Sequence, residues 1–281
     1  MPELPEVETV ARQLAPILTG RTVLGVEVFD PKLSHCKLES LVGSRFLDVV
    51  RVGKQVALIV DRDALASVVL IHLRMSGRLL WHPMSSDDPI VVPEVLLHSR
   101  VVAGKHIRFR LQCSDGTVEF IDPRRFGTCA IYPSLSAVPL VGVEPLGESF
   151  SVECLTALLK DSRQPLKPWL LRQDRIVGLG NIYASEILFR AGLSPFRAAG
   201  SLENSEIRHL YEQIRATLLD AIAMCGTTFS DFQQSNGESG GFQRFLTVYE
   251  RESQPCRRCD SEIVRSVQAG RSSYHCRRCQ A

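Results

Sequence analysis

The first residues of the chain carry groups that could act as a nucleophile and as a proton shuttle. The sequence begins Met1-Pro2-Glu3, and removal of the initiator methionine would expose Pro2 as a secondary amine. An α-amino group has a pKa of about 8, so an appreciable fraction is neutral and nucleophilic at pH 7. Its attack on a sugar or aldehyde carbon would give an iminium ion, whose fixed positive charge is an electron sink. Glu3 is close enough in sequence to move protons for the same reaction.

The same segment also has a simpler interpretation as an exposed entry to a helix. Apolar residues between Pro5 and Leu18 recur at helical spacing, and Gly20 is a typical helix end. Pro5 suits the first helical turn, where the helix dipole favours glutamates. Pro16 is expected to kink or shorten the last turn. Composition alone favours this interpretation, so the other motifs must decide whether the N-terminus is catalytic.

Four cysteines near the end of the sequence have the spacing of a zinc site. Two residues separate Cys256 from Cys259 and Cys276 from Cys279, and 16 residues lie between the pairs. This spacing brings four thiolates to one tetrahedral ion and leaves no position for water, which predicts structural zinc. Two disulfides are the alternative, but an odd total of nine cysteines and no recognisable secretion signal favour a reducing compartment.

The segment around these cysteines is basic, although the whole chain has a net charge of only +2. Residues 255–281 contain six arginines and two acidic residues, and a local excess of this kind is typical of a polyanion partner. Glu262–Tyr274 is expected to form a hairpin with Arg271, next to Gly270, at its tip. Such a tip could enter a nucleic-acid groove, although many zinc modules of this type bind protein instead.

The rest of the chain must position these groups, and its composition is that of a globular protein. Its 281 residues suffice for two domains with their own cores. The sequence is 44% hydrophobic and 23% charged, which excludes a disordered chain. No apolar run approaches the roughly 20 residues that a membrane span requires.

Between Arg21 and Phe126 the sequence consists of short β patterns separated by turns. Many short strands after one helix predict an antiparallel sandwich or barrel. Ser114-Asp115-Gly116-Thr117 is a hairpin signal. Residues 84–104 have no clear period and are interpreted as an irregular loop. Examples of the expected strands are residues 22–29, 45–52, 55–61, 67–73, 106–113 and 117–122.

Three turns in this β region carry side chains suited to DNA. Lys54 lies at a turn tip, where it would be either solvated or in contact with a phosphate. Met75 and Phe126 lie on two further turns, and residues of these types are more often part of a core. A Met, a Phe and the nearby Arg124 on turn tips are, however, the shapes that wedge into a duplex and replace an extruded base.

The pattern changes to helical after a segment with three prolines and two glycines, residues 133–147. Helices are expected at residues 151–160, 165–172, 182–191 and 202–224, with Ser151 as the cap of the first. The second helix carries Lys167. Asn181 follows a glycine turn, where backbone N–H groups suit a phosphate, but it could equally be a helix cap.

A polar, glycine-rich segment follows these helices at residues 227–241. A long polar loop in a compact protein is often a lid or a binding loop, and otherwise a linker. The sequence alone leaves both interpretations open.

These motifs, present together and in this order, resemble bacterial formamidopyrimidine-DNA glycosylase over essentially the whole chain. Leu4 favours the purine-repair branch, because the related endonuclease VIII-type enzymes usually have glycine there. The chain departs from the family pattern at Glu250, where glycine is common, and at Val143, where proline is usual. The matching stretches are Pro2–Glu8, His72–Gly77, Asp122–Gly127, Gly178–Tyr183 and the four-cysteine hairpin.

The resemblance implies a role for each candidate residue. Pro2 would be the nucleophile at the sugar C1′, Glu3 the proton donor and shuttle, and Lys54 a contact near the lesion and its phosphate. Met75, Arg124 and Phe126 would fill the void left by the flipped nucleotide, with Arg124 facing the orphaned base, preferably cytosine. The implied phosphate contacts are Lys167, Asn181 and Arg271.

The expected fold is α+β, with an N-terminal helix plus an antiparallel β-sandwich domain, a helical domain and a C-terminal four-cysteine zinc hairpin. The resemblance implies a helix-two-turns-helix arrangement for the helical domain. The expected parts are a catalytic domain (1–132), a linker (133–147), a DNA-binding domain (148–226), a lesion-covering loop (227–243) and the zinc-finger hairpin (250–281).

The implied function is that of a bifunctional DNA glycosylase and AP lyase that excises 8-oxoguanine and formamidopyrimidines from duplex DNA. The resemblance implies β- and δ-elimination, one structural zinc ion, a monomer and a bacterial cytoplasmic, nucleoid-associated location. Three alternatives stay open: an endonuclease VIII-like glycosylase for oxidised pyrimidines, a non-catalytic zinc-containing DNA-binding protein, and a lesion sensor in which Met1 is retained and Pro2 is blocked.

Overall fold

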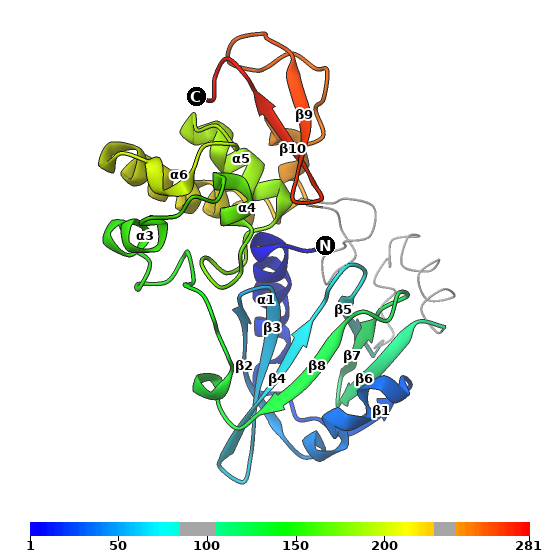
Figure 1. Cartoon of the computed structure of the whole chain (residues 1–281). Coiled ribbons are helices and arrows are strands. Elements are labelled where there is room, and N and C mark those ends of the chain that lie inside the picture. Colours follow the sequence, from blue (N-terminus) through cyan, green and yellow to red (C-terminus); the bar gives the residue numbers. More distant parts are fainter. Residues whose placement is uncertain (85–104, 228–239) are drawn as a thin grey trace. The chain divides into compact units, whose positions relative to one another are not determined.

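The computed structural model covers residues 1–281 and describes all of them except 85–104 and 228–239 (Figure 1). The chain divides into two compact units, one formed by Met1–Pro139 and Cys225–Gly241, the other by Leu140–Met224 and Phe242–Ala281. The irregular segment and the lesion-covering loop expected from the sequence fall almost entirely outside the described residues.

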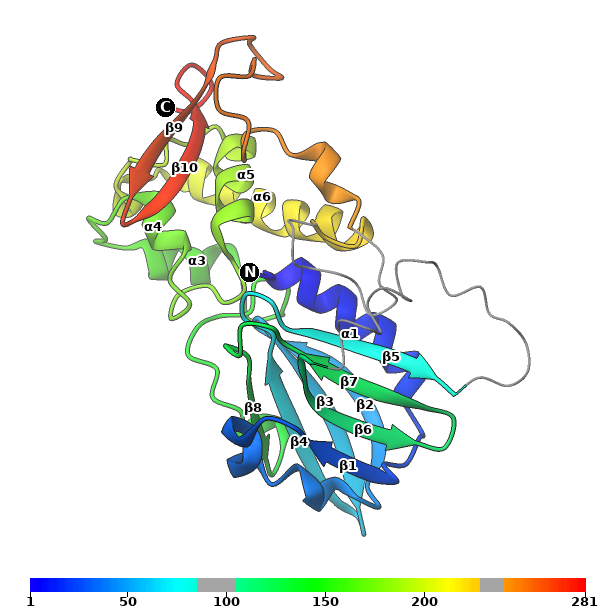
Figure 2. The ribbon, with the colours of Figure 1, turned by 90° about the vertical axis from the view of Figure 1, so that its right-hand side faces the viewer.

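The first unit is a two-sheet sandwich with one long helix. The sheets have the strand orders β2-β3-β4-β8 and β1-β6-β7-β5, and every strand pair is antiparallel. Figure 2 shows α1 beside the sheets. The elements are α1 (Leu4–Leu18), β1 (Gly25–Val28), η1 (Pro31–Cys36), η2 (Leu38–Leu41), β2 (Arg45–Val52), β3 (Gln55–Arg62), β4 (Leu65–His72), β5 (Arg78–Pro83), β6 (Ile107–Cys113), β7 (Gly116–Ile121), β8 (Thr128–Tyr132) and η3 (Leu135–Ala137).

One core joins α1 to both sheets because each element presents an apolar face. In β6, Phe109 and Leu111 belong to this core, whereas Arg110 and Gln112 hydrogen-bond to Glu27 of β1 on the opposite face. This alternation is the period-two pattern of a strand buried on one side. The rings of Phe109 and Phe120 lie 5.3 Å apart between the sheets.

The sandwich and most of its elements were predicted, with differences at the ends. The first expected strand is shorter than residues 22–29, because only Gly25–Val28 pairs along β6 and Thr22 makes an isolated bridge. Strands β5 and β8 are not among the examples named from the sequence. Pro16 lies inside α1, which continues to Leu18.

The second unit contains the α-helices that follow α1 and the C-terminal hairpin. Ser151 caps α3 as predicted, since its Oγ accepts a hydrogen bond of 3.2 Å from the backbone N–H of Cys154. The elements are α3 (Val152–Leu159), α4 (Leu166–Leu170), α5 (Asn181–Ala191), η4 (Ala199–Ser201), α6 (Asn204–Ala223), η5 (Phe242–Phe245), β9 (Ile263–Gln268) and β10 (Arg271–Cys276). The α5 helix packs against both α6 and β10.

Candidate active site and nucleic-acid interface

Pro2 and Glu3 are buried at the N-terminal end of α1, and the Glu3 side chain has only 3% of its surface exposed. Glu3 is the N-cap of the helix and forms a capping box with Glu6, whose carboxylate accepts a 2.8 Å hydrogen bond from the Glu3 N–H. Capping satisfies N–H groups that have no partner within the helix. The segment is therefore a helix entry, as one interpretation predicted, but it is enclosed rather than exposed.

Glu6 also connects this helix to a distant part of the chain. Its Oε1 accepts hydrogen bonds from the backbone N–H and the hydroxyl of Thr227, at 2.8 and 2.9 Å. The preceding Gly226 has a φ of +74°, and a Cβ there would lie 2.7 Å from the same Oε1. Only glycine therefore fits beside the Glu6 carboxylate, which is 2% exposed.

Lys54 lies in the turn between β2 and β3, next to the helix that carries Pro2. The Glu8 carboxylate on α1 pairs with Arg51 at 2.8 Å, and Arg51 also donates to the carbonyl of Gly53 at 3.1 Å. These contacts fix the turn against α1. Lys54 is 8% exposed, so it is buried and is not the solvated turn tip that was one of the two expectations.

The register of one sheet brings the other candidate turns to the same end. Gln55, directly after Lys54, pairs with His72 of β4, and His72 pairs with Thr128 of β8. The turns after β4 and before β8 therefore lie in line with the Lys54 turn. Figure 2 shows the loops joining β4 to β5 and β7 to β8 at the end of the unit where the N-terminus lies.

Met75 and Phe126 project from these two turns. Their side chains are 40% and 52% exposed, which excludes the interpretation that they are core residues. Arg124 is also exposed, and its guanidinium lies 5.0 Å from the centre of the Phe126 ring. The exposed Met on one turn, and the exposed Arg and Phe on the neighbouring turn, give the surface of this unit an apolar and cationic feature.

His72 stabilises the backbone just before Met75. Its Nδ1 accepts a 3.0 Å hydrogen bond from the N–H of Arg74, whose φ is +56°. Burial lowers the pKa of His72 to about 4, and the positive charges of Arg74 and Lys54 act in the same direction. The imidazole is therefore neutral at pH 7 and able to accept this bond.

The second unit holds the three expected phosphate contacts in different surroundings. Arg271 is exposed at the first position of β10, directly after Gly270, as expected for the tip of the C-terminal hairpin. Lys167 is 1% exposed, and its ammonium donates to the carbonyl of Ser272. Asn181 is the first residue of α5, and Gly180 is the cap, so the interpretation of Asn181 as the cap is wrong.

The Gln173 side chain makes two hydrogen bonds to the glycine turn before α5. The Gln173 carbonyl oxygen accepts from the N–H of Gly178 at 3.0 Å, and its amide donates to the carbonyl of Leu179 at 2.9 Å. The Oδ1 atom of Asn181 is buried without a hydrogen-bond partner among the residues that the structure describes. A buried amide oxygen of this kind can accept a hydrogen bond from water or from a bound ligand.

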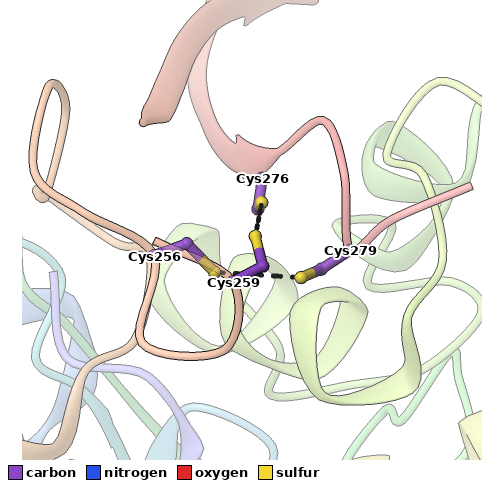
Figure 3. A group of neighbouring side chains, drawn as sticks. All are labelled: Cys256, Cys259, Cys276 and Cys279. Atoms are coloured by element: carbon purple, nitrogen blue, oxygen red, sulfur yellow. Dashed lines mark hydrogen bonds between the residues drawn. The ribbon is translucent and has the colours of Figure 1, made fainter. Parts of the chain in front are cut away.

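The four C-terminal cysteines form one cluster (Figure 3). All four sulfur atoms lie within 4.8 Å of one another, and the pairs Cys256–Cys279 and Cys259–Cys276 are 3.9 and 3.5 Å apart. Four thiolates at the usual Zn–S distance would be separated by about 3.8 Å, so the cluster fits a tetrahedral zinc ion. None of the nine cysteines, all of which lie in the described ranges, forms a disulfide.

This cluster is packed against helix α5. Cys256 and Cys276 are fully buried in an apolar group with Phe189. Arg258, between the two cysteines of the first pair, lies 4.4 Å from the Phe189 ring centre and donates to the carbonyl of Phe189. The zinc site therefore also fixes the base of the hairpin on the helical body.

Three family models together match most of the chain. They are the formamidopyrimidine-DNA glycosylase N-terminal domain (residues 1–129), the formamidopyrimidine-DNA glycosylase H2TH domain (141–233) and the zinc finger found in FPG and IleRS (253–281). A formamidopyrimidine-DNA glycosylase from Dechloromonas aromatica is 40% identical with full coverage of both chains, and one from Ruegeria sp. is 41% identical. The chain belongs to the formamidopyrimidine-DNA glycosylase family.

Solved structures of formamidopyrimidine-DNA glycosylases have the same fold. The Thermus thermophilus protein is 37% identical with a TM-score of 0.81, and the match covers 99% of this chain and 98% of that one. A Lactococcus lactis variant in complex with Fapy-dG-containing DNA is 29% identical, with a TM-score of 0.84 and 99% coverage of both chains. The chain is thus a DNA-repair glycosylase with a structural zinc site, and AP lyase activity is a property of its family.

The two departures from the formamidopyrimidine-DNA glycosylase pattern have different local consequences. Glu250 has a φ of +56°, the left-handed conformation that favours glycine. The N–H of Val143 donates to the carbonyl of Arg175 at 2.9 Å, a bond that proline cannot make. Within the described residues, no helix is long and apolar enough to cross a membrane.

Several polar residues near the candidate site of this glycosylase were not predicted from the sequence to have a role. Asp122 and Ser76 lie in motifs that carried the resemblance, yet their contact joins two turns that are 46 residues apart. The sequence pattern identified Glu6 only as one of the glutamates favoured in the first helical turn. Its contact with Thr227 has no signal in the local sequence, because it depends on how the chain returns to α1.

Proposed function

We propose that this chain excises oxidised purines from duplex DNA by nucleophilic attack of Pro2, and then cuts the DNA on both sides of the abasic sugar. Family membership supports the reaction class. The observation that carries the assignment of residues is the burial of Pro2 and Glu3 at the N-terminus of α1, at the end of the unit that also bears Lys54, Met75 and Phe126.

The chemistry starts with the neutral Pro2 amine, formed after removal of Met1. Its nitrogen attacks C1′ as the N-glycosidic bond breaks and the base leaves with the bonding electrons. The proton lost from the Pro2 nitrogen balances the proton that the departing base takes up. Glu3 donates the proton that assists opening of the sugar ring, which gives the iminium between Pro2 and C1′. The enclosed position of Glu3 limits access of water to this proton transfer.

The iminium then acts as the electron sink for strand cleavage. Loss of a proton from C2′ expels the 3′ phosphate in β-elimination, and loss of a proton from C4′ expels the 5′ phosphate in δ-elimination. Water finally hydrolyses the bond between Pro2 and the sugar remnant. Lys54 is assigned to the phosphate beside the lesion, because its positive charge lies next to the α1 end that carries Pro2.

Met75, Arg124 and Phe126 are assigned to the space left by the flipped nucleotide. Their exposure on neighbouring turns supports this role, since flipping leaves an unstacked gap that apolar side chains can fill. Arg124 would face the orphaned base, preferably cytosine. Lys167, Asn181 and Arg271 are assigned to phosphates, with Arg271 the most accessible of them.

In this assignment residues 1–132 are the catalytic domain, 133–147 a linker and 148–226 the DNA-binding domain. Residues 227–243 cover the lesion, and 250–281 form the zinc-finger hairpin. The enzyme would act as a monomer on damaged duplex DNA at the bacterial nucleoid. The zinc ion would hold the hairpin and take no part in the chemistry, because four cysteines fill its coordination sphere.

Borohydride trapping tests this proposal with tag-free protein and a duplex that contains 8-oxoguanine opposite cytosine. A covalent band that maps to Pro2, and that Pro2→Gly abolishes while DNA binding persists, is the expected result. A Lactococcus lactis relative has been solved with DNA containing an oxidised pyrimidine, so a second duplex carries such a base. Trapping only on that duplex would assign the chain to pyrimidine repair, and no trapping with either would leave a binding protein or sensor.

A further inference from the structure

The carboxylate of Asp122 lies between the two turns that carry the proposed void-filling side chains. Its Oδ1 accepts a 2.5 Å hydrogen bond from the hydroxyl of Ser76, the residue after Met75, and a 3.2 Å bond from the N–H of Arg124. Its Oδ2 accepts a 2.7 Å bond from the N–H of Gly127, the residue after Phe126. Asp122 is 1% exposed, so these bonds form away from water.

Both turns have the same unfavourable backbone geometry. Arg74 and Arg125, which directly precede Met75 and Phe126, have φ values of +56° and +58°. Left-handed backbone at a residue other than glycine is unfavourable and persists only where surrounding contacts impose it. The hydrogen bonds of Asp122 to Arg124 and Gly127 enclose the strained residue of the second turn.

Each turn also closes on a glycine that has no room for a side chain. A Cβ on Gly77 would lie 2.4 Å from the carbonyl oxygen of Leu73, and a Cβ on Gly127 would lie 2.4 Å from the Phe120 ring. The turns are therefore tight at their bases, and the side chains at their tips project outward.

A second buried layer holds the Asp122 segment from behind. Arg108 of β6 donates from Nε to the main-chain carbonyl of Asp122 at 2.6 Å and lies 3.7 Å from the Asp30 carboxylate. Asp30 also accepts a 3.0 Å hydrogen bond from Nε of Arg125, and this bond lowers the pKa of Asp30. The Arg125 guanidinium is thereby bonded to a buried carboxylate of the unit, although Arg125 is exposed, as are Arg124 and Phe126.

We propose that Asp122 is a positioning residue that couples the Met75 turn to the Arg124–Phe126 turn, so that the three side chains enter the duplex as one preset wedge. This inference rests on the void-filling role proposed above. Fixing the turns before binding avoids ordering them at the moment when the base must unstack. The Ser76 hydroxyl is the specific link, because it is the group of the first turn that Asp122 binds.

Ser76→Ala tests the coupling with less disturbance of the fold than Asp122→Asn. The substrate pair is a duplex with 8-oxoguanine opposite cytosine and the same duplex with a ready-made abasic site. We expect single-turnover base excision to fall about tenfold, the effect of one lost hydrogen bond to a charged group. Borohydride trapping at the abasic site, where no base has to be displaced, should change less than twofold. Ser34→Ala, which removes a surface hydroxyl bond to Pro31 in the same unit, is the matched control.

A double-mutant cycle measures the coupling energy between the two turns, which a general loss of stability would not change. Met75→Ala and Phe126→Ala are measured singly and together, with Ser76 and again with Ala at position 76. Their effects on base excision should be non-additive with Ser76 present and additive without it. Equal coupling in both backgrounds, or an equal fall on both substrates, would overturn the inference. Absence of trapping by the unmodified protein on either substrate would instead reject the proposed function on which it rests.

Discussion

Glu6 and Thr227 are 221 positions apart, yet the Glu6 carboxylate accepts hydrogen bonds from both the N–H and the hydroxyl of Thr227. The same carboxylate accepts from the N–H of Glu3 at the start of α1. One buried side chain therefore joins the proposed catalytic N-terminus to the end of the segment Cys225–Thr227.

Glu6→Gln should destabilise the protein, because an amide has one acceptor oxygen where the carboxylate has two. Either the Glu3 N–H or the Thr227 donors would face an amide NH2 group. The free energy of unfolding is expected to fall by about 2 kcal/mol, the range for an unsatisfied buried donor. Denaturant unfolding measures this, with Glu39→Gln on the exposed surface as the control. Equal midpoints for the two variants would contradict the prediction.

Cys256→Ala should abolish zinc binding, since three thiolates cannot complete the four-sulfur site. The hairpin is held on α5 by the cluster, so DNA affinity should fall together with the zinc content. Metal analysis and a DNA-binding titration on the same preparation check both effects. Cys154→Ala lies outside the cluster and should retain zinc and DNA affinity. Tight DNA binding by zinc-free protein would show that the hairpin does not need the metal.

Removal of the positive charge at Arg271 and at Lys167 should have different effects on DNA affinity and thermal stability. Arg271→Ala should weaken DNA binding several-fold and lower the salt dependence of the affinity by about one unit of slope, as expected for one lost phosphate contact. Its thermal stability should be unchanged, because the side chain is exposed. Titrations at several salt concentrations measure the slope. An unchanged slope would remove Arg271 from the phosphate contacts.

Lys167→Ala should, unlike Arg271→Ala, also lower thermal stability, since its buried ammonium donates to the carbonyl of Ser272 near the tip of the hairpin. Removing a buried donor leaves the acceptor without that bond and creates a cavity. Thermal unfolding of the zinc-loaded protein is the measurement. A melting temperature equal to that of Arg271→Ala would contradict this structural role.

The sequence predicted the sandwich, the helices and the zinc cluster because each has a local signal. The short β patterns between Arg21 and Phe126, the Ser151 cap and the cysteine spacing can all be recognised within short windows. Residue type alone favours burial of Met75 and Phe126, so the sequence left their exposure open as one of two interpretations. The burial of Lys167 was not predicted, because lysine is usually exposed. The contacts of Asp122 and Glu6 depend on tertiary packing, which local spacing does not specify.

Glu250→Gly should stabilise the protein, because position 250 has a φ of +56°. Glycine adopts this conformation without the penalty paid by other residues, although it also increases the entropy of the unfolded chain. The net gain is expected to be about 0.5 kcal/mol. Thermal unfolding at fixed zinc content detects it, and Glu252→Gly, two residues away, should not be stabilising. A lower melting temperature for Glu250→Gly would mean that the Glu250 side chain contributes more than its backbone strain removes.

His72 should make the stability of the first unit depend on pH. Its pKa is lowered from 6.5 to about 4 in the folded protein, so the unfolded chain binds more protons between these values. The contribution of neutral His72 is therefore complete above pH 6.5 and is lost as the pH falls toward 4. Protonation would also remove the acceptor for the Arg74 N–H.

His72→Asn, whose amide oxygen can replace Nδ1 but does not titrate, should lose less stability between pH 7.5 and 4.5 than the unmodified protein. Denaturant unfolding at the two pH values measures this, with the exposed His209→Asn as the control. Equal pH dependence in all three proteins would mean that the Arg74 turn is held without neutral His72.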